Sequence, residues 1–155
     1  MAGMTPGTLV LLGFPPPRTP YDELRAAGHD PLAADPADAP ETGPRYVAGA
    51  ALRIGAAAPR TPLVLVAYGA AGPALPALGG AQRAAHRLVG AYVFVDAELP
   101  VPAGDWPDAP CGYLATSPGD PRLDAARLRA WRTSASAAAG SGGLASALLE
   151  LIDDL

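Results

Sequence analysis

The chain has 155 residues, of which 50% are hydrophobic and 17% are charged, so it is suited to folding as a globular domain and not to remaining disordered. Its 11 basic residues are all arginine and are outnumbered by 15 acidic residues, which gives a formal net charge of −4. No cluster of basic and aromatic residues stands out, which argues against a nucleic-acid partner.

We expect a single domain over residues 1–155, located in the cytoplasm. The lone Cys111 cannot form an internal disulfide, so the fold does not depend on an oxidising compartment. The apolar stretch Thr8–Phe14 lacks a basic region before it and is too short to span a bilayer, so we expect no membrane partner. The absence of lysine beside abundant Ala, Gly, Pro and Arg is typical of a GC-rich genome.

The first elements alternate between strand and helix. Leu9–Leu12 is predicted as a strand, and Thr19–Ala27 carries the cap, proline and acidic residues of a helix start before Gly28 ends the helix. A weak strand at Pro31–Asp35 is followed by a proline-rich loop and a helix over about residues 45–57. The apolar face of that helix comprises Tyr46, Val47, Ala50, Ala51 and Ile54.

The centre of the chain predicts a βαβ unit. Leu63–Val66 and Tyr92–Val95 are continuous apolar runs, as expected for parallel strands buried on both faces, and helical sequence lies between them. A loop rich in proline and glycine follows Asp96. The remaining predicted elements are a strand at 111–115, a helix at 120–132 with Leu123, Ala126, Leu128 and Trp131 on one face, an edge strand at 132–136, and a helix at about 144–154.

This alternation predicts an α/β fold with a mostly parallel sheet of about five or six strands and helices on both faces. Ligands of such sheets bind beyond the carboxyl ends of the strands. The candidate site residues are therefore those that follow the strands: Gly13 and Phe14, Asp35, Tyr68 to Gly72, Asp96 to Leu99, and Thr116 to Asp120.

The third predicted strand runs into a tight turn and a helix start, but the apex of the turn is Gly69, which has no nucleophile. A turn of this form holds a reactive serine or a phosphate in several α/β enzymes. Residues 63–76 and 90–100 resemble the α/β-hydrolase superfamily, especially small bacterial members that read LVLVGHSGAGPLLP and GYVFVDAGLP there. The segment 106–114, with Ser117-Pro118 beyond it, resembles the strand that follows. The resemblance implies a truncated α/β-hydrolase-like domain without a lid.

Carried over by position, the resemblance implies a degenerate catalytic triad. The serine position falls on Gly69, the histidine position before it on Tyr68, and the second glycine of G-x-S-x-G on Ala71. The family histidine precedes the last helix, where this chain reads Ala138–Gly143 and offers no base. Acyl transfer at this turn requires an Oγ atom that glycine lacks, so a serine hydrolase is disfavoured.

The two histidines do not replace the missing base. His29 precedes the second strand, which puts it at the amino ends of the strands, and His86 is expected in the helix after residue 73. An oxyanion site made of backbone N–H groups would survive the loss of both side chains. The resemblance places those N–H groups at Phe14 and Ala70, with Gly69 beside them as part of the ligand pocket.

Two side chains are predicted as catalytic candidates, each with a structural alternative. Asp96 ends a buried strand and could act as an acid or base, or could fix the loop that follows it. Tyr68 could offer its phenol to a ligand or form a pocket wall. Thr116, Ser117 and Asp120 form the expected pocket rim, although Asp120 also precedes a helix in the manner of a cap. The thiol of Cys111 is expected to be an inert core group.

The sequence favours a non-hydrolytic enzyme of bacterial specialised metabolism that performs a cyclisation, elimination or rearrangement on a small hydrophobic or carbonyl-containing ligand. We expect no cofactor and no metal. The first alternative is a non-catalytic pseudo-hydrolase that binds a ligand or a partner protein, and a homo-oligomer is also compatible with the apolar composition. The second alternative is a dinucleotide-binding domain, because Ala67, Gly69 and Gly72, with Asp96 further on, partly match the G-x-G-x-x-G fingerprint.

Overall fold

The computed structural model, which describes the chain except for residues 1–3, 38–41 and 137–139, is a parallel six-stranded sheet between two layers of helices. The strand order is β2-β1-β3-β4-β5-β6, and every strand pair is parallel. The strands are β1 (Thr8–Leu12), β2 (Asp30–Ala33), β3 (Leu63–Tyr68), β4 (Val89–Val95), β5 (Cys111–Ala115) and β6 (Arg132–Ala135). The predicted α/β class is confirmed, and no lid domain is seen in the described part of the chain.

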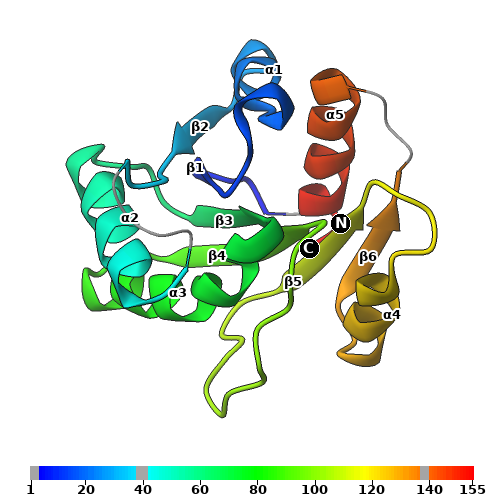
Figure 1. Cartoon of the computed structure of the whole chain (residues 1–155). Coiled ribbons are helices and arrows are strands. Elements are labelled where there is room, and N and C mark those ends of the chain that lie inside the picture. The colour runs from blue at the N-terminus through cyan, green and yellow to red at the C-terminus, as the bar shows by residue number, and fades with distance from the viewer. Residues whose placement is uncertain (1–3, 38–41, 137–139) are drawn as a thin grey trace.

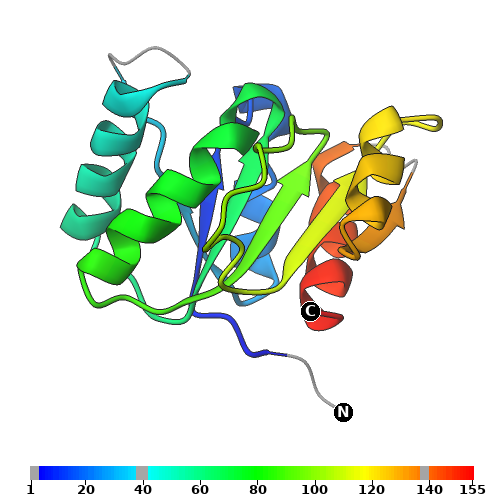
Figure 2. The same cartoon turned by 90° about the horizontal axis from the view of Figure 1, so that it is seen from below.

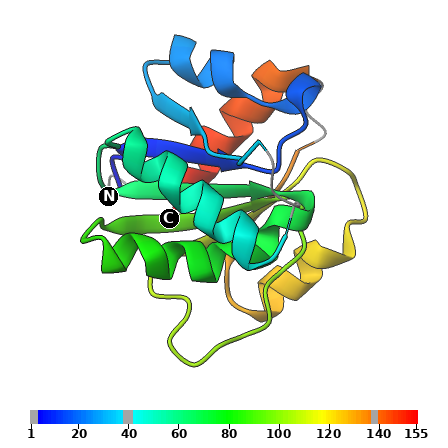
Figure 3. The same ribbon diagram turned by 60° about the vertical axis from the view of Figure 1, so that its left-hand side comes forward.

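The helices divide between the two faces of the sheet (Figure 1, Figure 3). The α-helices are α1 (Tyr21–Ala26), α2 (Pro44–Ala56), α3 (Leu75–Ala84), α4 (Pro121–Leu128) and α5 (Gly140–Asp153). Two short 3-10 helices follow β1 and β3: η1 (Pro16–Arg18) and η2 (Gly69–Ala74). Helices α1 and α5 cover one face, and α2, α3 and α4 cover the other.

Side-chain alternation along the strands explains this arrangement. In β1, Val10 and Leu12 belong to the core under α2 and α3, whereas Leu9 and Leu11 belong to the core under α1 and α5. All four side chains are buried, as expected of a strand covered on both sides. The apolar runs in the sequence are therefore continuous because the central strands are buried on both faces of the sheet.

The connection from β4 to β5 is a long loop, not a helix, and it crosses the α3 side of the sheet (Figure 2). Trp106 from this loop packs edge-on against Tyr92, Phe94 and Trp131, with ring centroids 5.2, 6.2 and 5.9 Å away. Asp108 holds the same loop by accepting a 2.7 Å hydrogen bond from the Tyr92 hydroxyl. An aromatic cluster thus covers the face where a crossover helix would otherwise lie.

The largest differences from the predicted boundaries are in the last two helices. The helix expected over 120–132 ends at Leu128, because Ala130 adopts φ +60° and the chain turns into β6. Leu128, expected on the buried face, is 90% exposed. The last helix begins at Gly140, about one turn before the expected start. His86 lies beyond the end of α3, at φ +61°, and not inside the helix.

Candidate functional site

The order of the strands reverses between β1 and β3, and a cavity opens there. From β1 the chain moves to β2 on one side and then crosses to β3 on the other, so the loops after β1 and β3 diverge. Such a switch point is where open parallel sheets bind ligands. The cavity has a volume of about 490 Å³. Its lining comprises Gly13, Phe14, Pro15, Pro16, Asp35, Pro36, Tyr46, Tyr68, Ala70 and Ala71.

The turn after β3 has the sharp geometry that the sequence predicts. Gly69 adopts φ +60°, a left-handed conformation that favours glycine, and its carbonyl accepts a 3.0 Å hydrogen bond from the Glu98 N–H. A Cβ atom placed on Gly69 would meet nothing within 4 Å. Gly69 itself is not among the cavity-lining residues, whereas Tyr68, Ala70 and Ala71 around it are.

Gly13 allows the loop after β1 to lie close to the turn after β3. It adopts φ +79°, and a Cβ atom there would collide with the Tyr68 carbonyl oxygen and lie 2.8 Å from the Ala71 Cβ. The loop after β1 can therefore approach the turn after β3 only because residue 13 has no side chain. This close approach brings Phe14 and Ala70 into the lining of the same cavity.

Those two N–H groups are available to a ligand. No described residue accepts a hydrogen bond from the Phe14 N–H. Ala70 is in the first turn of η2, whose N–H groups have no partner within the helix. The backbone anion site predicted at Phe14 and Ala70 stays a prediction, and both residues line the cavity.

Asp35 supplies a carboxylate to the cavity. Its Oδ1 accepts a 2.8 Å hydrogen bond from the Gly13 N–H and a 2.5 Å hydrogen bond from the Tyr46 hydroxyl. No described residue donates to Oδ2. The sequence predicts Asp35 at a strand end and Tyr46 on the buried face of a helix. It does not predict their contact, because helical spacing carries no information about a partner 11 residues away.

Tyr68 separates the cavity from a second, smaller recess. Its ring packs against Phe14 at a centroid distance of 5.2 Å, and its hydroxyl accepts a 3.1 Å hydrogen bond from Arg18. The recess has a volume of about 350 Å³ and is polar at its rim. Arg18, Tyr68, Asp96, Ser117, Pro118, Gly119, Asp120, Pro121 and Arg122 line it.

Asp96 is engaged by a neighbouring loop. One carboxylate oxygen accepts a 2.9 Å hydrogen bond from the Thr116 N–H, and the other accepts from the Thr116 hydroxyl. Its backbone adopts φ +45°, and its carbonyl accepts from Arg122 at 3.0 Å. These contacts fit the structural interpretation of Asp96, in which it fixes the loops after β4 and β5. Its catalytic role stays a prediction.

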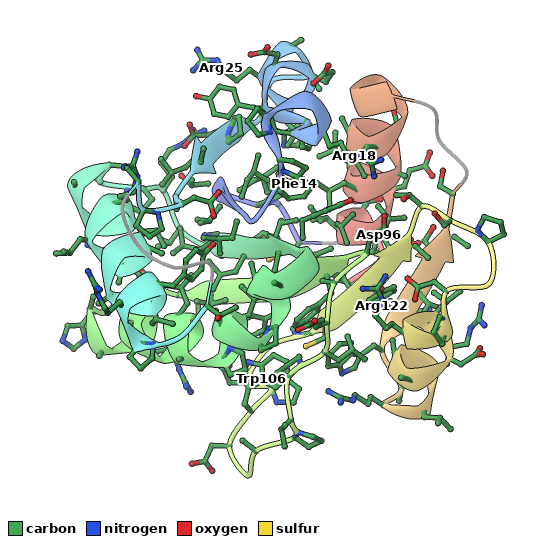
Figure 4. All side chains as sticks on the ribbon, viewed as in Figure 1. Phe14, Arg18, Arg25, Asp96, Trp106 and Arg122 are labelled. Atoms are coloured by element: carbon green, nitrogen blue, oxygen red, sulfur yellow. The ribbon has the colours of Figure 1, made fainter. Side chains whose placement is uncertain are left out.

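Asp120 is the N-cap of α4, as its sequence context indicates. It accepts hydrogen bonds from the Arg122 N–H at 2.9 Å and from the Tyr113 hydroxyl at 2.7 Å, and it forms a 2.9 Å ion pair with the Arg122 guanidinium. Burial alone would raise the pKa of Asp120, but the hydrogen bonds from Arg122 and Tyr113 outweigh it and lower that pKa. Figure 4 shows Arg122 beside Asp96 at this part of the sheet edge.

The remaining nucleophile and base candidates lie away from the cavity. His29 immediately precedes β2 at the amino end of the sheet, and His86 is exposed beyond α3. Cys111 is buried at the start of β5, and burial raises the pKa of its thiol to about 12, with a smaller contribution from Asp108. None of these three groups lines the cavity at the switch point.

The described residues contain no group of three or more His, Cys, Asp and Glu side chains that could hold a metal ion. Across those same ranges, no helix has the length and apolar character needed to cross a membrane. Fold and site together define an α/β protein with a cavity at the switch point of a parallel sheet. No family model, no curated protein and no solved structure matches this chain.

Proposed function

We propose that the protein is a non-hydrolytic enzyme that binds a small carbonyl-containing ligand in the cavity between β1 and β3. One observation carries this proposal: the cavity is lined by Asp35, whose Oδ2 accepts from no described residue, and by Phe14 and Ala70, whose backbone N–H groups donate to no described residue. The volume of about 490 Å³ is within the range of small-molecule sites. Most of the lining is apolar, as ligand pockets are.

Asp35 is the acid or base of the proposed reaction. Because Gly13 and Tyr46 both donate to Oδ1, the carboxylate is fixed in orientation while Oδ2 is left to accept a proton. Asp96 is less suited to this task, because Thr116 occupies both of its oxygens. We therefore propose Asp35 as the acid or base in place of Asp96, the candidate predicted from the sequence.

The proposed step is proton abstraction next to a carbonyl group. Asp35 Oδ2 takes a proton from the α-carbon, and the electron pair of the broken C–H bond moves to give an enolate whose oxygen accepts from the Phe14 and Ala70 N–H groups. In a ligand with a β,γ C=C bond, return of the proton to the γ-carbon gives the conjugated isomer. In a ligand with a leaving group on the β-carbon, the enolate electrons form the α,β C=C bond, and the leaving group departs with the electrons of its own bond. Neither route needs the serine that Gly69 lacks.

The test is catalysed exchange of α-protons of 4-phenylbutan-2-one in D₂O, followed by NMR. We expect the wild type to accelerate exchange and Asp35→Asn to lower the rate by about 100-fold, the scale of general base catalysis. Asp124→Asn, which changes an exposed aspartate of α4, is the matched control and should retain the wild-type rate.

Two results would contradict this assignment. Loss of exchange in Asp96→Asn with full activity in Asp35→Asn would move the base to the other recess. Binding of the ketone without any accelerated exchange would favour the second candidate function, a non-catalytic ligand-binding protein. That candidate is supported by the distance of His29 and His86 from the cavity, since neither can complete a hydrolytic pair there.

The structure gives less support to dinucleotide binding. The fingerprint needs an acidic side chain free to bind a ribose, but both oxygens of Asp96 accept from Thr116. Close to Gly72, the Glu98 carbonyl oxygen occupies the space that a Cβ atom would fill. The approach that a pyrophosphate would need at this glycine is therefore taken by the chain itself.

A further inference from the structure

Arg18, at the boundary of the two recesses, has no anionic partner among the described residues. It donates one hydrogen bond, to the Tyr68 hydroxyl at 3.1 Å, and forms no salt bridge with any described carboxylate. By contrast, Arg122 on the opposite rim donates to Asp120 and to the Asp96 carbonyl oxygen. Of the two cations that line the polar recess, Arg122 is therefore held by structural contacts, whereas Arg18 is paired with no described carboxylate.

Tyr68 adds a second free donor at the same point. Its oxygen accepts from Arg18, but no described residue accepts the proton of the Tyr68 hydroxyl. An arginine N–H and a phenol O–H on adjacent side chains suit a carboxylate, which can accept one hydrogen bond on each oxygen. Arg18 also lies at the end of the short helix η1, which begins at Pro16, so proline fixes the backbone that carries it.

The two recesses share a wall at Tyr68. Pro16 lines the apolar cavity, Arg18 lines the polar recess, and Tyr68 lines both. Figure 4 shows Phe14 and Arg18 close together above the ends of the central strands, with Asp96 on the side towards Arg122. A ligand lying across the edge of Tyr68 would place an apolar body against Phe14 and an anionic group beside Arg18.

We propose that Arg18 and Tyr68 bind the carboxylate of a ligand whose apolar part occupies the cavity between β1 and β3. This rests on the proposed function and narrows its substrate class to an apolar oxo acid. The carboxylates of Asp96 and Asp120 also line the polar recess, so the dianionic charge of a phosphate would meet stronger repulsion than a single carboxylate.

The test uses the neutral fluorophore N-phenyl-1-naphthylamine as a reporter of the cavity and measures its displacement. The matched competitors are 3-phenylpropanoate and 3-phenylpropan-1-ol, which differ in the carboxylate alone. We expect the wild type to bind the carboxylate roughly tenfold more tightly than the alcohol, the gain expected of one charge-assisted hydrogen bond. That preference should fall as the salt concentration rises.

Arg18→Gln should abolish the preference without weakening the binding of the alcohol, and Tyr68→Phe should reduce it by a few-fold. The control is Arg53→Gln, which removes an exposed arginine from α2 and should keep the full preference. Arg18→Lys should retain only part of it, because an ammonium lacks the planar fork of a guanidinium.

The outcomes separate this inference from the proposed function. If the fluorophore and both competitors fail to bind, the cavity is not a ligand site and both proposals are wrong. If the fluorophore binds and the carboxylate and alcohol displace it equally, or if Arg18→Gln keeps the preference, the carboxylate site is wrong and the cavity remains. Circular dichroism of each variant distinguishes lost binding from lost folding.

Discussion

The carboxyl edge of the sheet has two halves that use their polar groups differently. Beyond β4 and β5, Asp96 and Asp120 hold neighbouring segments through Thr116, Tyr113 and Arg122. Beyond β1 and β3, no described residue donates to Asp35 Oδ2, and this carboxylate lines a cavity together with Phe14 and Ala70. We therefore regard a strand-end aspartate as a candidate acid or base where no described residue donates a hydrogen bond to one of its two oxygens.

Topology explains the contrast. From β4 onwards each strand lies next to the one before it in the chain, so consecutive loops on that side lie close enough to hydrogen-bond to each other. At β1 and β3 the chain leaves in opposite directions, so the loops separate and a cavity remains. Each half of the edge can be tested by substituting the residues that shape it: Gly13 beside the cavity, and Asp120 and Thr116 in the hydrogen-bonded half.

The largest effect is expected at Gly13. A Cβ atom at φ +79° would be strained and would collide with the Tyr68 carbonyl oxygen, so Gly13→Ala should lower the free energy of unfolding by about 4 kcal/mol. The control is Gly28→Ala, at φ +89° with nothing within 4 Å of the new Cβ, where strain alone should cost about 1 kcal/mol. Urea unfolding of both variants gives the comparison, and equal losses would mean that the close approach at Gly13 contributes nothing.

A smaller loss of unfolding free energy is expected at Asp120, in the half of the sheet edge beyond β4 and β5. Asp120→Ala removes the N-cap of α4 and leaves the Tyr113 hydroxyl without its acceptor, which should cost about 2 kcal/mol of unfolding free energy. The fold should persist, because the cores under both helix layers are untouched. A loss below about 0.5 kcal/mol would mean that this half is not held by its carboxylates.

The same residue predicts a pH dependence. The pKa of Asp120 is lowered in the folded protein, so its contribution to stability is complete above the unfolded value of about 4 and is lost as the pH falls through the folded value. Asp120→Asn should therefore destabilise the protein at pH 7 and much less at pH 3. Urea midpoints at the two pH values measure this, and a constant difference would contradict it.

The smallest effect is expected at Thr116. Thr116→Val keeps the backbone N–H bond to Asp96 and removes the hydroxyl bond, which should cost about 1 kcal/mol. Ser117→Ala, at the exposed neighbouring position, should leave stability unchanged. If Thr116→Val also frees Asp96 to support proton exchange, the two halves differ only in how tightly their carboxylates are held.

Much of the fold follows from local sequence. The apolar runs at 63–66 and 92–95 are predicted as buried strands and lie within β3 and β4, and the strand at Cys111–Ala115 is observed with the predicted bounds. The helix after Asp120 is shorter than predicted because its periodic pattern continues through Trp131, while the left-handed residue Ala130 ends it. That residue is an alanine, and nothing in its local sequence indicates a positive φ.

The location of the candidate site at the strand ends follows from the sequence, whereas the hydrogen-bond partners of its side chains do not. The turn at Gly69 and the strand-end positions of Asp35, Tyr68 and Asp96 are fixed by the sequence, because strand and turn propensities act over a few residues. Only the tertiary structure decides that Asp96 is engaged by Thr116 while Asp35 keeps a free oxygen beside Tyr46. Those pairings join residues 11 and 20 positions apart, and they depend on strand order, which no local pattern encodes.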